Sequence, residues 1–249
     1  MFKFRFFHGT SKIFLNSIVE FGLGGINPNY KYKNLDLLRF LTQEAEKKAL
    51  KNEKYIHLRK AVLAMSEQGF SNIILPNGQK FKTNYRHDGI YVGVTKGRAL
   101  TYACLNKYGS EILEHCILLY QILKSVDENF KLPNALNLFQ IEKYIGMEHK
   151  PILIELTNIN DSEVETENGE NGSEKLNHLR NLLPNLKNHE KDIMMSYSNF
   201  KLLNPILKDR MKFYEIEFEG TLGQKDFEFT MTEIKPAVNS GLQKLGFWS

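Results

Sequence analysis

The spacing of hydrophobic residues changes several times along this chain, and each change predicts a secondary-structure element. Apolar and basic side chains alternate over residues 2–7, which is typical of a strand. Residues 13–21 carry apolar side chains at helical spacing and are followed by glycines, which commonly end a helix. The pattern therefore predicts a strand, a tight turn and a helix, with Thr10 or Ser11 as the helix cap.

The middle of the chain combines helical and strand-like spacing. Residues 35–69 predict one or two helices, and residues 96–126 predict helical structure with a break near Gly109. A hairpin is expected around residues 76–78, because Pro-Asn-Gly favours a turn between two strand-like runs. Further strands are predicted at residues 88–94, 151–156, 212–218 and 226–234.

The order of these elements predicts the fold class. Strands come early, in the middle and late, whereas helices are concentrated in the first two thirds, which indicates an α+β fold. A parallel dinucleotide-binding fold is not expected, since the GLGG at residues 22–25 follows a helix and that fold needs its glycine-rich turn after a strand. Residues 160–175 are acidic with few apolar side chains, so we expect a mobile surface loop there.

Composition narrows the class of protein. With 249 residues, of which 42% are hydrophobic, the chain can bury one large core. The net charge of +4 is the small difference between 33 basic and 29 acidic residues, so it does not by itself favour a nucleic-acid partner. Basic residues gather at 47–60, where a solvated helix face is the simpler interpretation than a nucleic-acid site.

Cysteine usage and the N-terminal segment bear on location. Cys104 and Cys116 would lie about 18 Å apart on one helix, too far for a disulfide, and we interpret them as reduced core thiols. Neither CxxC nor HxxxH spacing occurs, so we expect no metal site. Charged residues interrupt the apolar N-terminal segment, and no run approaches the roughly 20 apolar residues of a membrane span. We expect no signal peptide and no membrane partner, hence a cytoplasmic protein or an effector delivered into a host cell.

Three segments carry residues that can act together: FFHGTS at 6–11, DGIYVGVTKGRALTYA at 88–103 and DFEFTMTEI at 226–234. In this order they resemble the His-Tyr-Glu signature of ADP-ribosyltransferases of the diphtheria-toxin and poly(ADP-ribose)-polymerase class. The separation of Tyr91 and Tyr102, eleven residues, matches that family's pattern.

The resemblance implies a split antiparallel β-sheet with flanking helices in a single domain of residues 1–249. A helical and hairpin insertion would occupy residues 25–87, and a variable segment residues 157–211. It also implies NAD+ as a substrate and transfer of one ADP-ribose unit to a macromolecular acceptor, a protein rather than a nucleic acid. A bacterial or phage toxin, or an effector, would suit this activity.

The resemblance also assigns roles to particular residues. Cleavage of the bond between nicotinamide and ribose passes through a state resembling an oxocarbenium ion, which a carboxylate stabilises. Glu228 would supply that carboxylate and bond the 2′-hydroxyl of the nicotinamide ribose. His8 would bond a hydroxyl of the adenosine ribose, and the backbone of Gly9 would hold the carboxamide. Tyr91 and Tyr102 would sandwich the nicotinamide ring.

The chain departs from the family pattern at two positions. Ala99 replaces a serine that bonds the carboxamide in many relatives, so that hydrogen bond is either missing or supplied by Thr95 or Thr101. Asp226 stands where arginine-modifying relatives have Glu or Gln, and it could orient an acceptor substrate. Thr10 completes the expected cofactor-binding set.

Other interpretations remain open at this level. The late strands offer competing carboxylates, namely Glu215, Glu217, Glu219 and Glu233. An RNA 2′-phosphotransferase also uses NAD+ and begins with a similar His-Gly-Thr, but it would need arginines around the phosphate, and those near the motifs are Arg5, Arg86 and Arg98. A catalytically silent module that binds NAD or ADP-ribose is the third interpretation, and Ala99 is the residue that favours it.

Overall fold

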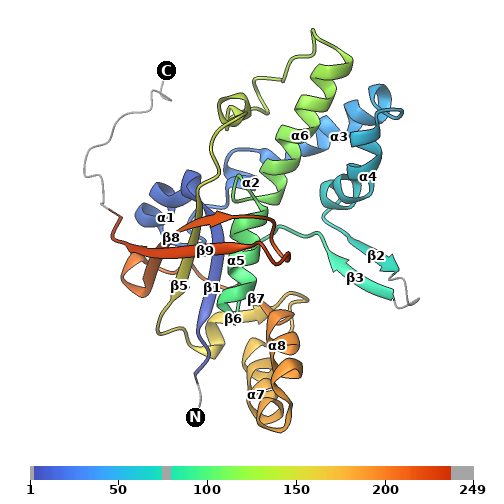
Figure 1. Ribbon diagram of the computed structural model, residues 1–249. Helices are drawn as coiled ribbons and strands as arrows, with labels where there is room; N and C mark the ends of the chain where they lie inside the picture. The colour runs from blue at the N-terminus through green and yellow to red at the C-terminus, as the bar shows by residue number, and fades with distance from the viewer. Residues whose placement is uncertain (1–2, 75–79, 237–249) are drawn as a thin grey trace.

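The computed structural model describes residues 3–74 and 80–236, and a seven-stranded antiparallel β-sheet lies at the centre of this part (Figure 1). The strands of the sheet are β1 Phe6–Ser11, β4 Tyr91–Gly93, β5 Pro151–Leu156, β6 Val164–Thr166, β7 Asn199–Leu202, β8 Met211–Glu219 and β9 Glu228–Ile234. Their order in space is β6-β7-β4-β1-β5-β8-β9. The α+β class is therefore confirmed.

Eight α-helices surround the sheet in the described part of the chain. They are α1 Leu15–Phe21, α2 Pro28–Lys31, α3 Asn34–Lys48, α4 Glu53–Ser66, α5 Lys96–Leu105, α6 Glu111–Val126, α7 Gly172–Leu182 and α8 Asn188–Ser196. Figure 1 shows α3, α4 and the end of α6 grouped at one end of the molecule and α7 with α8 at the other. None of the described helices is long and apolar enough to cross a bilayer.

A separate two-stranded hairpin projects beside α4 (Figure 1). Its strands, β2 Phe70–Ile74 and β3 Lys80–Asn84, pair antiparallel, as the sequence predicts. The predicted turn at residues 76–78 lies outside the described residues.

The core forms on strand β5, whose six residues are all buried. Strand β5 pairs with β1 along one edge and with β8 along the other. Ile152 and Ile154 enter one hydrophobic cluster and Leu153 a second, so both faces of the strand are covered and its sequence is a nearly continuous apolar run. The exception is Glu155, whose carboxylate accepts hydrogen bonds from Arg5 at 3.2 Å and from the Tyr214 hydroxyl at 3.1 Å. These two bonds compensate for its burial.

Two glycines set the ends of helices where the sequence predicts them. Helix α1 ends at Gly22, which has a φ of 83°. Gly109 separates α5 from α6 and has a φ of 69°, and an added Cβ would lie 2.8 Å from the Thr10 hydroxyl. A left-handed conformation in so little space suits glycine alone. The predicted break near Gly109 is confirmed.

The predicted hydroxyl cap at Thr10 or Ser11 is wrong, although Ser11 does precede the short 3-10 helix Lys12–Phe14 that leads into α1. Both residues lie within β1 and are buried. Thr10 donates its hydroxyl to the backbone oxygen of Gly109 at 3.3 Å, and the Ser11 hydroxyl has no hydrogen-bond partner among the described residues. Strand β1 continues further than the His-Gly-Thr motif indicates, because β5 pairs with it along its whole length.

The predicted loop at residues 160–175 is also wrong. This acidic segment contains β6 and the start of α7. Val164 and Leu176 are buried, and the Asn171 side chain caps α7 by accepting from the backbone N–H groups of Ser173 and Glu174. A few well-placed apolar side chains and one good cap are enough to order a segment whose composition is polar.

The sheet opens between β1 and β4. Strand β1 pairs with β5 at six consecutive residues, but its described pairing with β4 is limited to Phe7 opposite Gly93. On its other side β4 is extended by β7, which pairs Tyr91 with Lys201 and Gly93 with Asn199. From the pair of Phe7 and Gly93 the two halves of the sheet therefore diverge toward Thr10 on β1 and Tyr91 on β4, and leave space between them.

Candidate active site

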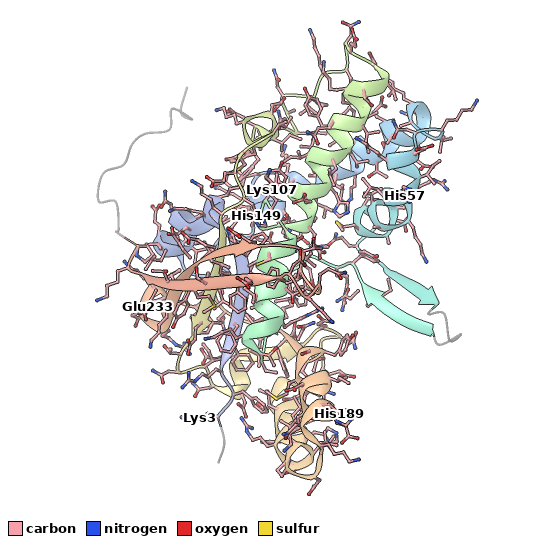
Figure 2. The ribbon with its side chains drawn as sticks, viewed as in Figure 1. Lys3, His57, Lys107, His149, His189 and Glu233 are labelled. Carbon is pink, nitrogen blue, oxygen red and sulfur yellow. The ribbon has the colours of Figure 1, made fainter. Side chains whose placement is uncertain are left out.

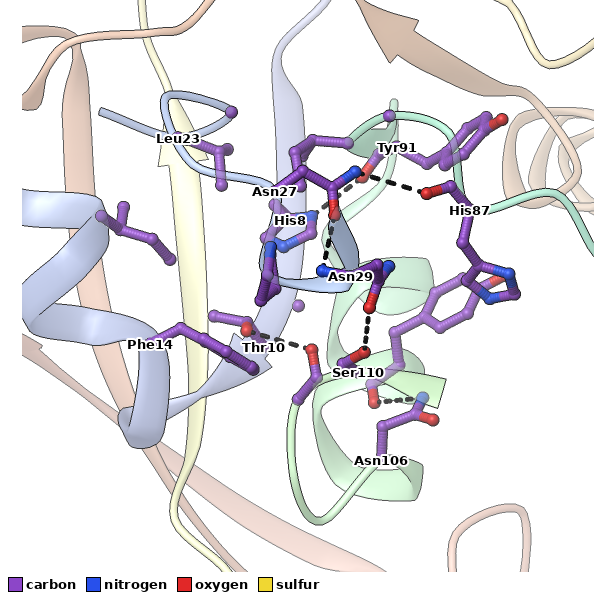
Figure 3. Close-up of a pocket in the computed structure, with 18 of the residues that line it drawn as sticks. His8, Thr10, Phe14, Leu23, Asn27, Asn29, His87, Tyr91, Asn106 and Ser110 are labelled. Carbon is purple, nitrogen blue, oxygen red and sulfur yellow. Dashed lines mark hydrogen bonds between the residues drawn. The ribbon is translucent and has the colours of Figure 1, made fainter. Parts of the chain in front are cut away.

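A cavity of about 480 Å³ lies where β1 and β4 diverge, between these strands, α1, α2, α5 and the start of α6. Its size is within the usual range for small-molecule sites. Six of the expected site residues line it: His8, Gly9, Thr10, Tyr91, Ala99 and Tyr102. Figure 3 labels His8, Thr10 and Tyr91 among them. The structure thus brings the first two of the three motif segments together.

The third motif segment lies elsewhere. Glu228 begins β9, is exposed, and is not among the residues that line the cavity; the same holds for Asp226. Strands β5 and β8 separate β9 from β1, and at about 4.8 Å per strand this amounts to roughly 14 Å along the sheet. Glu228 pairs with Glu219 across the outermost hairpin. Neither Glu228 nor Asp226 shares the cavity with His8.

His8 is held by the backbone of the neighbouring strand. Its Nδ1 lies 2.8 Å from the carbonyl oxygen of Tyr91 (Figure 3). A carbonyl only accepts, so Nδ1 carries the proton and Nε2 is a hydrogen-bond acceptor when the ring is neutral. Burial lowers the pKa of His8, and the bond to Tyr91 opposes this shift without cancelling it. His8 therefore offers an acceptor atom at neutral pH.

Gly9 has a packing role that the sequence does not reveal. A Cβ added to Gly9 would lie 2.7 Å from the backbone nitrogen of Ala103 and 3.0 Å from the carbonyl carbon of Ala99, and closer still to the Ala99 oxygen. The absence of a side chain allows α5 to lie directly against β1. Ala99 is itself 2% exposed, so a small side chain suits this contact as well.

Tyr91 ends in a polar network on the outer side of β4. Its hydroxyl donates to Asp88 at 2.7 Å, and Asp88 accepts from Lys201 at 3.0 Å. Lys201 also pairs with Glu165 of β6 at 3.1 Å. Burial and the bond to Asp88 raise the pKa of Tyr91 above its usual range, so the phenol stays neutral. The network joins three neighbouring strands and fixes the direction of the Tyr91 side chain.

Arg98 and Tyr102 form a stacked pair one turn apart on α5. The guanidinium carbon of Arg98 lies 4.6 Å from the centre of the Tyr102 ring, and Nη2 donates to the Tyr102 hydroxyl at 3.2 Å. The Nε of Arg98 is buried with no hydrogen-bond partner among the described residues. Tyr102 is 36% exposed, which leaves part of its ring accessible from the cavity.

Glu111 and His87 meet at another wall of the cavity. The Nε2 of His87 lies 3.0 Å from a carboxylate oxygen of Glu111, and its Nδ1 lies 2.8 Å from the carbonyl oxygen of Tyr85. Burial alone would raise the pKa of Glu111, but the hydrogen bond and charge of His87, with help from His115 and Arg98, lower it below its usual value. Glu111 is therefore a carboxylate at neutral pH.

A set of short polar side chains connects the α2 segment to the cavity floor, as Figure 3 shows. Asn27 caps α2 through the backbone N–H of Asn29 and donates its amide to the His87 carbonyl at 3.3 Å. Ser110 contacts the Asn29 side-chain oxygen at 3.5 Å and caps α6. These bonds tie the loop before α2 to both His87 and the start of α6.

Sequence reasoning missed several residues of this cavity, including His87, Glu111, Glu167 and Asn199, and it named Arg98 only for the phosphotransferase interpretation. Arg98 lies in the quoted central motif, four residues before Tyr102, and His87 directly precedes that motif. The i, i+4 spacing of Arg98 and Tyr102, and the position of His87 next to the motif, could have indicated these two residues. Asn199 comes from β7, which no sequence pattern identified.

The remaining histidines do not form a second site. His57 on α4 and His189 on α8 lie toward opposite ends of the molecule (Figure 2), and neither lines the cavity. The Nε2 of His149 donates to the Ala103 backbone oxygen at 2.9 Å, and the ring packs edge-on against Phe218. Within residues 3–74 and 80–236, no group of three His, Cys, Asp or Glu side chains could hold a metal ion.

Comparison with protein-family models, with curated proteins and with solved structures finds no match for this chain. The function is therefore inferred from the residues that line the cavity. The cavity combines an acceptor imidazole, two tyrosines, an arginine and an ionised carboxylate. Such a set can hold a ligand that has hydroxyl groups, a flat ring and negative charge.

Proposed function

We propose that this cavity binds NAD+ and that the protein is a mono-ADP-ribosyltransferase acting on a macromolecule, with a protein as the acceptor. The observation that carries the proposal is the meeting of His8, Tyr91 and Tyr102, from segments far apart in sequence, around one cavity at the opening of the sheet. The first two motif segments of the resemblance to the His-Tyr-Glu ADP-ribosyltransferases support this proposal, whereas the third, with Glu228, lies outside the cavity.

The polar groups suit a dinucleotide. The Nε2 of His8 can accept a hydrogen bond from a ribose hydroxyl, because its Nδ1–H is already used by the Tyr91 carbonyl. Tyr102 offers a partly exposed aromatic face for the nicotinamide ring. The Arg98 guanidinium supplies positive charge for the pyrophosphate. A bacterial or phage toxin, or an effector, remains the setting that we propose for this activity.

Direct titration of the purified chain with NAD+ by calorimetry tests the binding step. We expect His8→Ala to weaken binding about threefold to tenfold, the effect of one lost neutral hydrogen bond. Tyr102→Ala should weaken it at least fivefold, since stacking of a ring on an aromatic side chain is worth about 1–3 kcal/mol. His57→Ala, on α4 and outside the cavity, is the control and should bind as the wild type does.

Radiolabelled NAD+ tests the transfer step. Incubation with cell extracts should give labelled protein and free nicotinamide, whereas hydrolysis alone would give ADP-ribose and no labelled acceptor. Binding without either product would mean that the chain is a silent NAD-binding module. The absence of NAD+ binding by the wild type would refute the proposal.

A second candidate is an RNA 2′-phosphotransferase, favoured by the placement of arginines. Arg86 and Arg98 both line the cavity, whereas Arg5 bonds Glu155 instead. Arg86 is anchored by Asn84 and by the Glu167 backbone oxygen. An oligonucleotide with an internal 2′-phosphate distinguishes the two candidates, because the phosphotransferase would remove that phosphate only when NAD+ is present.

A further inference from the structure

We propose that Glu111, oriented by His87, is the carboxylate that stabilises the ribosyl cation in this protein. The inference rests on the proposed NAD+ chemistry and supplies the acid that the motif on β9 does not bring to the cavity. Glu111 is the first residue of α6, lines the cavity, and has a side chain about one third exposed (36%). A ligand in the cavity can therefore reach its carboxylate.

The imidazole of His87 is held between two partners. The Tyr85 carbonyl accepts at 2.8 Å, so Nδ1 must donate to it. The other ring nitrogen, Nε2, lies 3.0 Å from a carboxylate oxygen of Glu111. The imidazole therefore bridges the Tyr85 carbonyl and the Glu111 carboxylate. His87 acts as a positioning residue that keeps Glu111 ionised.

His87 is held rigidly from several directions. Its backbone N–H donates to the Gln68 side chain at 2.7 Å, and its carbonyl accepts from Asn27. With both ring nitrogens also bonded, the imidazole has one orientation. Only one oxygen of Glu111 is bonded to His87, and the other has no hydrogen-bond partner among the described residues. That oxygen is available to a ribose hydroxyl.

The other carboxylates near the cavity are less suited to this role. Glu20 is exposed on α1, and no hydrogen bond of the described structure orients the Glu167 carboxylate toward the cavity. The neighbouring β7 contributes Asn199, whose amide carries no charge. Glu111 combines a position in the wall, a negative charge and a fixed orientation.

The proposed step is a dissociative cleavage. The bond between C1′ of the ribose and N1 of nicotinamide breaks, and its electron pair stays on nicotinamide, which leaves as a neutral molecule. The ribose becomes an oxocarbenium ion, and the free oxygen of Glu111 accepts a bond from its 2′-hydroxyl while its charge stabilises the cation. The acceptor nucleophile, or water, adds to C1′ and releases its proton to solvent.

Nicotinamide release under single-turnover conditions and NAD+ binding by calorimetry test the assignment in matched variants of the full chain. Glu111→Gln should lower the rate of release by about 100-fold or more, comparable to losing one preorganised group in an active site. Its NAD+ dissociation constant should stay within about threefold of the wild type. Glu233→Gln, on the exposed strand β9 (Figure 2), is the control and should behave as the wild type.

His87 is tested by substitutions that keep or remove a donor. His87→Gln retains an N–H that can reach Glu111, and we expect it to recover at least tenfold of the rate lost in His87→Ala. An equal loss of the nicotinamide-release rate in both variants, or an unchanged rate in both, would overturn the positioning role of His87. Circular dichroism spectra and thermal midpoints of the variants show whether the fold is intact.

The outcomes separate this inference from the proposed function. If Glu228→Gln or Glu167→Gln lost nicotinamide release while Glu111→Gln stayed fully active, the role of Glu111 would be overturned and the NAD+ chemistry would stand. A wild type that binds NAD+ but releases no nicotinamide would overturn the catalytic role and leave the binding site. A wild type that does not bind NAD+ would overturn both.

Discussion

Gly9→Ala is the substitution that tests most directly how α5 supports the cavity. The added methyl group would lie 2.7 Å from the Ala103 nitrogen and 3.0 Å from the Ala99 carbonyl carbon, and it would overlap the Ala99 oxygen. These are backbone atoms of a helix, so they cannot rotate away as a side chain would. Forcing a methyl group into a filled core typically costs about 1–3 kcal/mol, and the rigid surroundings place this case at about 3 kcal/mol or more.

A loss of this size is large enough to measure. For a chain of about 250 residues each kcal/mol lowers the melting temperature by roughly 2–4 °C, so we expect a fall of at least roughly 6 °C. Because α5 carries Tyr102 and Arg98, its displacement should also weaken NAD+ binding under conditions where the variant is still folded.

Gly97→Ala is the matched control, on the same helix. An added Cβ at Gly97 meets no atom within 4 Å. Alanine is the better helix former, so this variant should be more stable by about 0.5–1 kcal/mol. Differential scanning calorimetry of both variants gives the comparison. A Gly9→Ala protein as stable as the wild type would refute the close packing of α5 on β1.

Two further predictions concern the segment that follows β5. Glu163 accepts a bidentate hydrogen bond from Arg210, which is about a quarter exposed, and this bond lowers the pKa of Glu163 from 4.5 to about 2. The ion pair should therefore stabilise the fold fully above about pH 4.5 and lose this effect as the pH falls toward 2. Glu163→Gln should therefore lower the free energy of unfolding by about 2 kcal/mol at pH 7, after allowance for solvent screening, and by little at pH 2.5. Removing the α7 cap in Asn171→Ala should cost about 1 kcal/mol in urea unfolding, whereas Asn181→Ala, exposed on the same helix, should cost nothing. Equal effects at both asparagines would contradict the cap.

Much of the fold could be predicted because its signals are local. The six residues of β5 form an apolar run that stands out from its surroundings, and the strand has the predicted bounds 151–156. Gly109 marks a helix break because few other residues adopt its backbone conformation. Strands β6 and β7 gave no comparable signal. They have three and four residues, and their apolar side chains become buried only when the two strands pair with each other and with β4.

The cavity could be predicted only in part, for a related reason. His8 and Tyr91 belong to short motifs whose residue types by themselves indicate a chemistry. The expectation that Glu228 lies in the cavity was wrong, because the sequence of a strand does not tell which other strand it will pair with. Strand β9 extends the sheet next to β8, so its first residue lies far from β4. Glu111 and His87 meet across 24 residues of chain, and only folding brings them into contact.

The position of β7 has a consequence for how the protein matures during translation. His8, Tyr91 and Tyr102 are all made in the first half of synthesis, yet β4 gains its outer neighbour only after residue 202 has left the ribosome. Until then a nascent chain would present β4 as an open edge of three residues, too short to hold itself in place. A growing chain should therefore acquire its ligand-binding capacity late, and premature termination before β7 should yield a product without it.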